Sequence, residues 1–320
     1  MMTGLAIAIA AGCASALMFA SIISGALISI VLFYLAPLPL MVAGLGWGAL
    51  SAGIGGLAAA LVLGGFVGFA YGAAFFITVA LPAFWLARLA LLGRAVPAEP
   101  PATGETVEWY PLGRILVWIA GFAMLTTAGA LLTLGSDAET INAAMRRGLT
   151  RVLGMQGTTS DSADASQVVE ALAMLLPSAA TLTAMLTLVL NLWLAGRVTQ
   201  MSGKLTRPWP EVMSTTPPPL TLAAFAIALV LCLTGGLLAL LAQIAAAALG
   251  TVYALMGFAT LHTLTLALKS RAIWLGFAYA AVLVFGWPVL AMACLGIADA
   301  LFGFRLAYRQ RRMPPPLPLS

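Results

Sequence analysis

Charged residues are scarce in this sequence, and its longest stretches lack them altogether. They make up 8% of the 320 residues, whereas a soluble globular protein contains about 25%. No Asp, Glu, Lys, Arg or His occurs from Met1 to Ala87 or in residues 272–298, and residues 212–268 contain only His262. Each stretch is longer than the roughly 20 apolar residues that one membrane span requires. The sequence is therefore not that of a soluble domain.

Sequence motifs of common enzymes and metal sites are also missing. There is no GxxxxGKS/T phosphate-binding loop, no HExxH pair and no GxSxG nucleophile motif. The single histidine and the three cysteines lie at least 30 positions apart inside apolar stretches, so they are not spaced as metal ligands. We therefore expect no enzyme, no metal site and no cofactor.

The residues that are present favour helices in a lipid bilayer. The chain is 62% hydrophobic, its mean hydropathy is +1.06, and its apolar residues are contiguous and rich in Ala, Leu and Gly. A transmembrane barrel would instead show strands of about ten residues in which apolar and polar side chains alternate. We predict an all-α fold, a polytopic transmembrane bundle of about 8–10 helices.

Most basic residues lie at the ends of apolar segments, as the positive-inside rule predicts for cytoplasmic loops. The clusters are Arg88 with Arg94, residues 197–207, Lys269 with Arg271, and residues 305–312. We predict a membrane protein with both termini in the cytoplasm. This placement also accounts for the net charge of +5, so we expect no nucleic-acid partner.

Composition divides the chain into four parts. Residues 1–94 form an N-terminal helical block rich in small residues, and residues 95–112 form a polar, proline-rich linker. Residues 113–312 form a C-terminal helical membrane region, and residues 313–320 form a proline-rich tail. The hydrophilic insertion 136–167 begins with apolar residues at helical spacing, which predicts an amphipathic helix at the membrane interface. In this topology the arginines of the insertion, Arg146, Arg147 and Arg151, lie on the other side of the membrane from the remaining basic clusters.

Small residues recur at every fourth position in two series. Such spacing lets helix backbones approach closely in lipid. A step of four drifts by about 40° around an ideal helix, so the longer series is expected to cover two successive helices. Two interpretations stay open, namely packing within the protein and a docking face for another membrane subunit. The longer series is Gly44, Gly48, Ala52, Gly56, Ala60, Gly64, Gly68 and Gly72, and the shorter is Ala6, Ala10 and Ala14.

Polar side chains inside the apolar segments are few, and burying them in lipid is costly, so they are candidates for function. Asn191, His262 and Asp299 form a speculative ligand-binding set, and no residue is assigned to catalysis. Each has a structural alternative: an interhelical hydrogen bond for Asn191, a hydrogen-bonded structural histidine, and an ion pair of Asp299 with Arg305. Gln243 is expected at a solvated turn between two spans, near residues 220–242 and 245–267.

Several short segments, in the correct order, carry a resemblance to a known family. They are APLPLMVAGLGWG (Ala36–Gly48), LNLWLAGRV (Leu190–Val198), KLTRPWP (Lys204–Pro210), His262 in its span, and LGIADALFGFR (Leu295–Arg305). Over most of its length the chain resembles YybS-like bacterial membrane proteins, domain-of-unknown-function family 2232, which implies the bacterial inner membrane as its location. That family is similar to the S-components of energy-coupling-factor vitamin transporters. Those proteins bind a micronutrient and dock on a transmembrane coupling subunit and two ATPases.

The resemblance implies a docking face at AxxxA spacing on the first helix, which Ala6, Ala10 and Ala14 match. It also implies a coupling subunit and ATPases as partners, beside the lipid bilayer itself. It transfers no substrate-binding residue, because none matches a vitamin-binding motif. The chain departs from S-components in its extra helices and its 136–167 insertion.

Two functions follow from these observations. The first is a transport-related subunit that binds a neutral or largely apolar small molecule among its helices and relies on partner ATPases. The alternative is a non-transporting scaffold or regulatory membrane protein that holds partners through small-residue faces and basic loops. An intramembrane enzyme centred on His262 and Asp299 is a third hypothesis, which the missing nucleophile motifs oppose.

Overall fold

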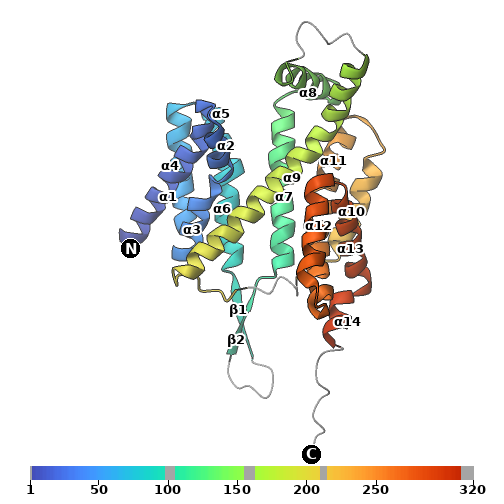
Figure 1. Ribbon diagram of the computed structural model, residues 1–320. Coiled ribbons are helices and arrows are strands. Elements are labelled where there is room, and N and C mark those ends of the chain that lie inside the picture. The colour runs from blue at the N-terminus through green and yellow to red at the C-terminus, as the bar shows by residue number, and fades with distance from the viewer. Residues whose placement is uncertain (1, 98–104, 155–162, 210–214, 311–320) are drawn as a thin grey trace, which may run out of the picture.

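The computed structural model describes residues 2–97, 105–154, 163–209 and 215–310 and is built mainly of helices (Figure 1). The predicted all-α transmembrane bundle is confirmed, while the tail 313–320 lies outside the described residues. Within these residues, seven helical segments are long and apolar enough to cross a membrane: Thr3–Ser24, Leu27–Trp47, Ala49–Phe66, Phe69–Ala90, Leu112–Leu132, Ser166–Met201 and Gly236–Leu264. Three apolar helices are shorter: Leu220–Leu231, Arg271–Phe285 and Pro288–Phe302.

The N-terminal block packs around a core of aliphatic and aromatic side chains. Phe19 and Phe75 meet in this core with ring centroids 5.3 Å apart. Pro82 lacks the backbone N–H that would donate to the carbonyl of Thr78 in an α-helix, and the chain just before this proline is π-helical. The elements are α1 (Met2–Ala20), the 3-10 turn η1 (Ser21–Ser24), α2 (Leu27–Tyr34), α3 (Pro37–Trp47), α4 (Ala49–Phe66), α5 (Phe69–Phe75), the π-helical η2 (Phe76–Ala80) and α6 (Leu81–Ala90).

Two glycines bring the backbones of α1 and α4 into contact. A Cβ atom on Gly12 would overlap the carbonyl of Gly55, and a Cβ atom on Gly55 would overlap the carbonyl of Ala8. Because neither helix has a side chain at the crossing, van der Waals contact between backbones holds the pair together. This contact turns Ala8 and Gly12 inward and leaves Ala6 and Ala10 exposed.

Part of the predicted small-residue ladder does pack helices within the block. A Cβ atom on Gly56 would lie 2.8 Å from the Cβ of Ala80 on η2. One on Gly72 would lie 2.7 Å from the Cα of Gly64, so α4 and α5 meet at these two glycines. The packing interpretation therefore fits Gly56, Gly64 and Gly72.

Two ladder glycines form turns and do not pack helices. Gly48 precedes α4 with a φ angle of 97°, and Gly68 precedes α5 with a φ angle of 136°. Glycine adopts such angles readily, whereas residues with a Cβ rarely do. Among the described residues Gly68 packs against no other helix, and a docking role for it stays a prediction. The ladder runs over three helices and two turns, not over two helices.

The predicted linker 95–112 contains a β-ribbon that the sequence analysis did not anticipate. β1 (Gly93–Pro97) and β2 (Glu105–Trp109) pair antiparallel, with Gly93 opposite Trp109 and Pro97 opposite Glu105. The ribbon projects from one end of the bundle (Figure 1). Each strand is five residues long and one contains proline, so neither gives a strong strand pattern.

α7 (Leu112–Leu132) is followed by the predicted amphipathic helix, α8 (Ala138–Val152). Asp137 caps α8: the Thr140 N–H donates to its Oδ1 at 2.9 Å, and the Thr140 hydroxyl donates to its Oδ2 at 2.7 Å. These hydrogen bonds lower the pKa of the Asp137 carboxyl. Ile141 and Met145 are buried against α7 and the later helix α11, so the predicted amphipathic helix is confirmed.

α9 (Ala163–Met201) is the longest helix, at 39 residues. It begins inside the predicted insertion 136–167 and continues past Arg197. The Thr181 hydroxyl donates to the carbonyl of Pro177 at 2.7 Å, and the helix continues through this proline. α9 crosses the molecule diagonally (Figure 1) and packs against α3, α7, α8 and α11. It thereby joins the N-terminal block to the rest of the bundle.

The C-terminal helices begin and end partly where expected. The uncharged stretch 272–298 is divided at Gly286, and Pro288 opens a new helix. The expected turn at Gln243 is wrong, because the chain turns earlier, at Gly235. Gln243 lies inside a helix and donates from Nε2 to the carbonyl of Met174 at 2.7 Å. The elements are α10 (Leu220–Leu231), α11 (Gly236–Leu264), η4 (Thr265–Ala267), α12 (Arg271–Phe285), α13 (Pro288–Phe302) and α14 (Phe304–Gln310).

A second pair of glycines joins α11 to α13. A Cβ atom on Gly257 would overlap the carbonyl of Met292, and one on Gly296 would overlap the carbonyl of Tyr253. The two halves of the protein thus use the same reciprocal backbone contact. None of these crossing glycines belongs to the predicted ladder.

The basic clusters lie at one end of the bundle. Figure 1 shows that the end of α6, the β-ribbon, the end of α9, the start of α12 and α14 all face this end, and α1 starts towards it. α8 with its arginines lies at the opposite end. The arrangement agrees with the predicted topology, and the assignment of the basic end to the cytoplasm stays a prediction.

Candidate functional site

A cavity lies between α7, α9 and α11. Its volume is about 480 Å³, within the range of small-molecule pockets. Leu116 on α7, Trp193 on α9 and Met256 on α11 represent its three helical walls. The loop that follows α9 adds Trp209, and α12 adds Tyr279. Segments that are far apart in the sequence therefore build one space.

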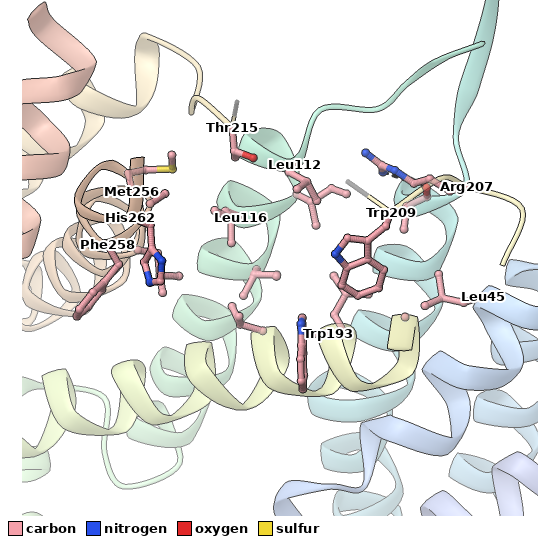
Figure 2. A pocket seen from close by; sticks show the side chains of 18 of the residues that line it. Leu45, Leu112, Leu116, Trp193, Arg207, Trp209, Thr215, Met256, Phe258 and His262 are labelled. Atoms are coloured by element: carbon pink, nitrogen blue, oxygen red, sulfur yellow. Dashed lines mark hydrogen bonds between the residues drawn. The ribbon is translucent and has the colours of Figure 1, made fainter. Parts of the chain in front are cut away.

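The cavity walls are almost entirely apolar. In Figure 2, Leu112 and Leu116 lie on α7 behind the space, Trp193 rises from α9 below it, and Met256 and Phe258 lie on α11 at its side. Burying apolar ligand surface against such walls contributes a binding free energy of about 25 cal/mol per Å², whereas burying an unpaired charge there is unfavourable. The cavity therefore suits a neutral, largely apolar molecule.

The loop after α9 is fixed in place beside the cavity by two arginines. The guanidinium carbon of Arg197 lies 5.1 Å from the ring centroid of Trp209, within cation–π range. Arg207 donates from Nη1 to the carbonyl of Ala90 at 3.1 Å and from Nη2 to that of Tyr110 at 3.0 Å. Burial lowers the pKa of the Arg207 guanidinium, although an arginine stays protonated in proteins. These contacts tie the loop to α6 and to the start of α7.

A polar corner at the junction of α11 and α12 interrupts the apolar wall. His262 Nε2 lies 2.8 Å from the Tyr279 hydroxyl oxygen, and His262 Nδ1 lies 3.4 Å from Arg271 Nη2. The Tyr279 ring stacks on Phe258 with centroids 5.1 Å apart and planes inclined by 2°. His262 and Tyr279 both line the cavity. Within the predicted ligand-binding set, His262 is the member that does so.

Asn191 and Asp299 do not line this cavity, and each makes the structural contact considered above as the alternative to ligand binding. Asn191 is fully buried and donates from Nδ2 to the carbonyl of Tyr34 on α2 at 2.8 Å, which is the interhelical hydrogen bond considered above. Asp299 accepts the backbone N–H of Arg305 at 2.9 Å and its Nε–H at 2.6 Å. The structure therefore does not gather the three predicted residues into one site.

A second cavity, of about 420 Å³, lies at the opposite end between α8, α9 and α11. Arg146 and Glu170 pair across it at 2.9 Å, and both side chains are exposed. An exposed pair of this kind contributes little to stability. Among the described residues, no group of histidine, cysteine and carboxylate side chains is placed to hold a metal ion.

Sequence reasoning missed most of the residues that define the main cavity. Trp193, Arg207, Trp209 and Tyr279 were not singled out, because nothing local marks an aromatic or basic residue as part of a distant cavity. A signal was nevertheless present. Two segments that carried the family resemblance, residues 190–198 and 204–210, meet at this cavity.

One family model matches the chain, that of the predicted membrane proteins DUF2232, over residues 13–300. The match includes every helix that lines the cavity. A search among curated proteins and one among solved structures found no match. The family part of the resemblance is therefore confirmed, whereas the further likeness to S-components stays a prediction.

Proposed function

We propose that this chain, which belongs to the DUF2232 family of predicted membrane proteins, is a small-molecule-binding subunit of a membrane transport system. The observation that carries the proposal is the apolar cavity of about 480 Å³ between α7, α9 and α11. Its ligand is neutral and largely apolar. In this role the protein acts like an S-component, with a transmembrane coupling subunit and ATPases as partners, and it performs no chemistry itself.

The lining of the cavity supports ligand binding over simple helix packing. The Trp193 side chain is 52% exposed although it borders the cavity. Aromatic side chains bury about 150–250 Å² each when covered, so a ligand that covers this ring gains a large apolar contact. The cation–π contact of Arg197 and the hydrogen bonds of Arg207 hold the neighbouring loop in advance, which reduces the ordering cost of binding.

Filling the cavity with a larger side chain tests the proposal. Leu116→Trp and Ala259→Trp place an indole in the space that the ligand is expected to occupy. Leu125→Trp is the matched control, because Leu125 lies on the same helix as Leu116 but on its exposed face. Native mass spectrometry of protein extracted in mild detergent should then show a bound small molecule on the wild type and the control only. A wild-type protein that is always ligand-free would sink the proposal.

A non-transporting scaffold is the alternative function, and one observation favours it. α1 buries Ala8 and Gly12 against α4, yet it leaves Ala6 and Ala10 exposed and Ala14 half-buried. The small residues of the AxxxA series are thus available to another helix in the membrane. On this hypothesis they hold a protein partner and the cavity is incidental.

Ala10→Leu distinguishes the two functions when complex formation and nutrient uptake are measured together. A transport subunit should lose both its co-purifying partner and uptake. A scaffold should lose its partner while uptake of every nutrient tested is unchanged. Ile9→Leu is the control, because Ile9 is exposed on the same helix and the substitution preserves size.

A further inference from the structure

The polar corner of the main cavity leaves one hydroxyl hydrogen free for a ligand. We propose that this hydrogen, on Tyr279, selects ligands that carry a carbonyl or similar acceptor oxygen on an apolar body. The inference rests on the proposed binding cavity and names the chemical class that fills it.

The hydrogen bonds of His262 have a fixed direction. An arginine guanidinium only donates hydrogen bonds, so His262 Nδ1, 3.4 Å from Arg271 Nη2, is the acceptor and carries no proton. The imidazole proton therefore resides on Nε2, which donates to the Tyr279 oxygen 2.8 Å away. The hydroxyl accepts this bond with its oxygen, and its own hydrogen remains unused among the described residues.

The position of the hydroxyl is set by its contacts with α11. α12 buries none of its described residues and packs against α13 and η4, and Tyr279 connects it to α11. The stack on Phe258, with planes inclined by 2°, fixes the ring plane, and the bond from His262 fixes the oxygen. Because Tyr279 lines the cavity, a ligand inside can reach the free hydrogen.

Most other polar side chains of the cavity favour the same ligand class; the exception is the Thr215 hydroxyl, which can accept as well as donate. Trp193 and Trp209 add indole N–H groups, which donate and never accept. Arg207 also only donates, and two of its N–H groups already bond backbone carbonyls. A ligand that itself needs an acceptor is poorly matched here. A ketone, ester or quinone oxygen on an apolar skeleton is well matched.

The test compares 1-tetralone with tetralin, which share a skeleton and differ in one carbonyl oxygen. Binding to protein in lipid nanodiscs is measured by ligand-observed NMR and expressed against the ligand concentration in the lipid phase, because tetralin partitions more strongly into lipid. The wild type should bind 1-tetralone about 3- to 10-fold more tightly, as expected for one net hydrogen bond. Tyr279→Phe should abolish this preference and leave tetralin affinity unchanged.

Two further variants separate the hydroxyl from general effects on folding. Tyr71→Phe is the control, because its hydroxyl donates to the Phe19 carbonyl at 3.2 Å in the N-terminal block, away from the cavity; the preference should persist. Arg271→Met removes the donor that fixes the imidazole tautomer. Tyr279 can then donate to His262, and the ratio of 1-tetralone affinity to tetralin affinity should fall towards one.

The possible results have distinct meanings. Equal affinity of the wild type for both compounds, or a preference that survives Tyr279→Phe, overturns the inference and leaves the cavity proposal standing. If neither compound binds, both the inference about Tyr279 and the proposed ligand-binding cavity are overturned. Nanodiscs of ester-linked and ether-linked lipids then identify the source of the natural carbonyl. If 1-tetralone binds more weakly in ester-linked lipid, the ester carbonyls compete for the site and the natural ligand is a lipid. Equal binding in both lipids means that the natural ligand is a free compound.

Discussion

Replacing Gly257 with alanine is expected to push α11 and α13 apart. The added Cβ atom would overlap the carbonyl of Met292 and lie 2.6 Å from its carbonyl carbon. Non-bonded carbon atoms prefer a separation of about 3.5–4.0 Å, so the two backbones must separate by about 1 Å at the crossing. Overpacking of this kind costs about 1–3 kcal/mol.

Gly276→Ala is the matched control, because nothing lies within 4 Å of a Cβ atom at this helical position of α12. Both substitutions gain the helix propensity of alanine, about 0.8–1.0 kcal/mol, so this gain cancels when the variants are compared. The free energy of unfolding of Gly257→Ala should therefore be about 1–3 kcal/mol below that of Gly276→Ala. The measurement is an unfolding titration with SDS in mild detergent micelles, followed by tryptophan fluorescence. Equal stability of the two variants would refute the backbone contact as a determinant of the fold.

Three other predictions concern the ion pair, the cap of α8 and the topology. Asp299→Asn removes the carboxylate that bonds the buried Arg305 guanidinium, so the same titration should show a loss of stability, at most about 3–5 kcal/mol. Asp137→Ala should speed hydrogen exchange of the first amides of α8. The pKa of the Asp137 carboxyl is lowered on folding, so the ionised carboxylate stabilises α8 fully above the unfolded pKa and this stabilisation is lost as the pH falls below about 4. If the exchange rates of these amides do not change across this pH range, the cap is contradicted. Single cysteines at Ser270 and Thr150, in a background without the natural cysteines, should react with an impermeant maleimide from opposite sides of the membrane, and labelling from one side would overturn the topology.

Features that depend on neighbouring residues were predictable from the sequence. The lack of charge excluded a soluble fold, and Gly286 with Pro288 marked the break between α12 and α13. The pair of Asp299 with Arg305 also belongs to this group, because six positions separate the partners and α14 starts between them. For the helix break and the ion pair, the physical cause lies within one or two turns of chain.

Features that depend on how helices rotate against each other were not predictable. Asn191 was correctly assigned an interhelical hydrogen bond, but its partner Tyr34 is 157 positions away. The crossing glycines, Gly12 with Gly55 in one half, have no pattern that distinguishes them from the other glycines of this glycine-rich chain. The cavity has the same limitation, because its aromatic and polar side chains meet only after the helices pack.

The length of α9 links this protein to the thickness of its membrane. At about 1.5 Å per residue, its 39 residues extend about 58 Å, nearly twice the roughly 30 Å of a hydrocarbon core. Mismatch with the bilayer concerns its uncharged part, residues 171–196, which extends about 39 Å and fits a thinner hydrocarbon core by tilting. α9 packs against α3 in one half and against α7 and α11 in the other, so its tilt and the packing of both halves are coupled. If the proposed cavity binds a ligand, its affinity is therefore expected to depend on the acyl-chain length of the surrounding lipid.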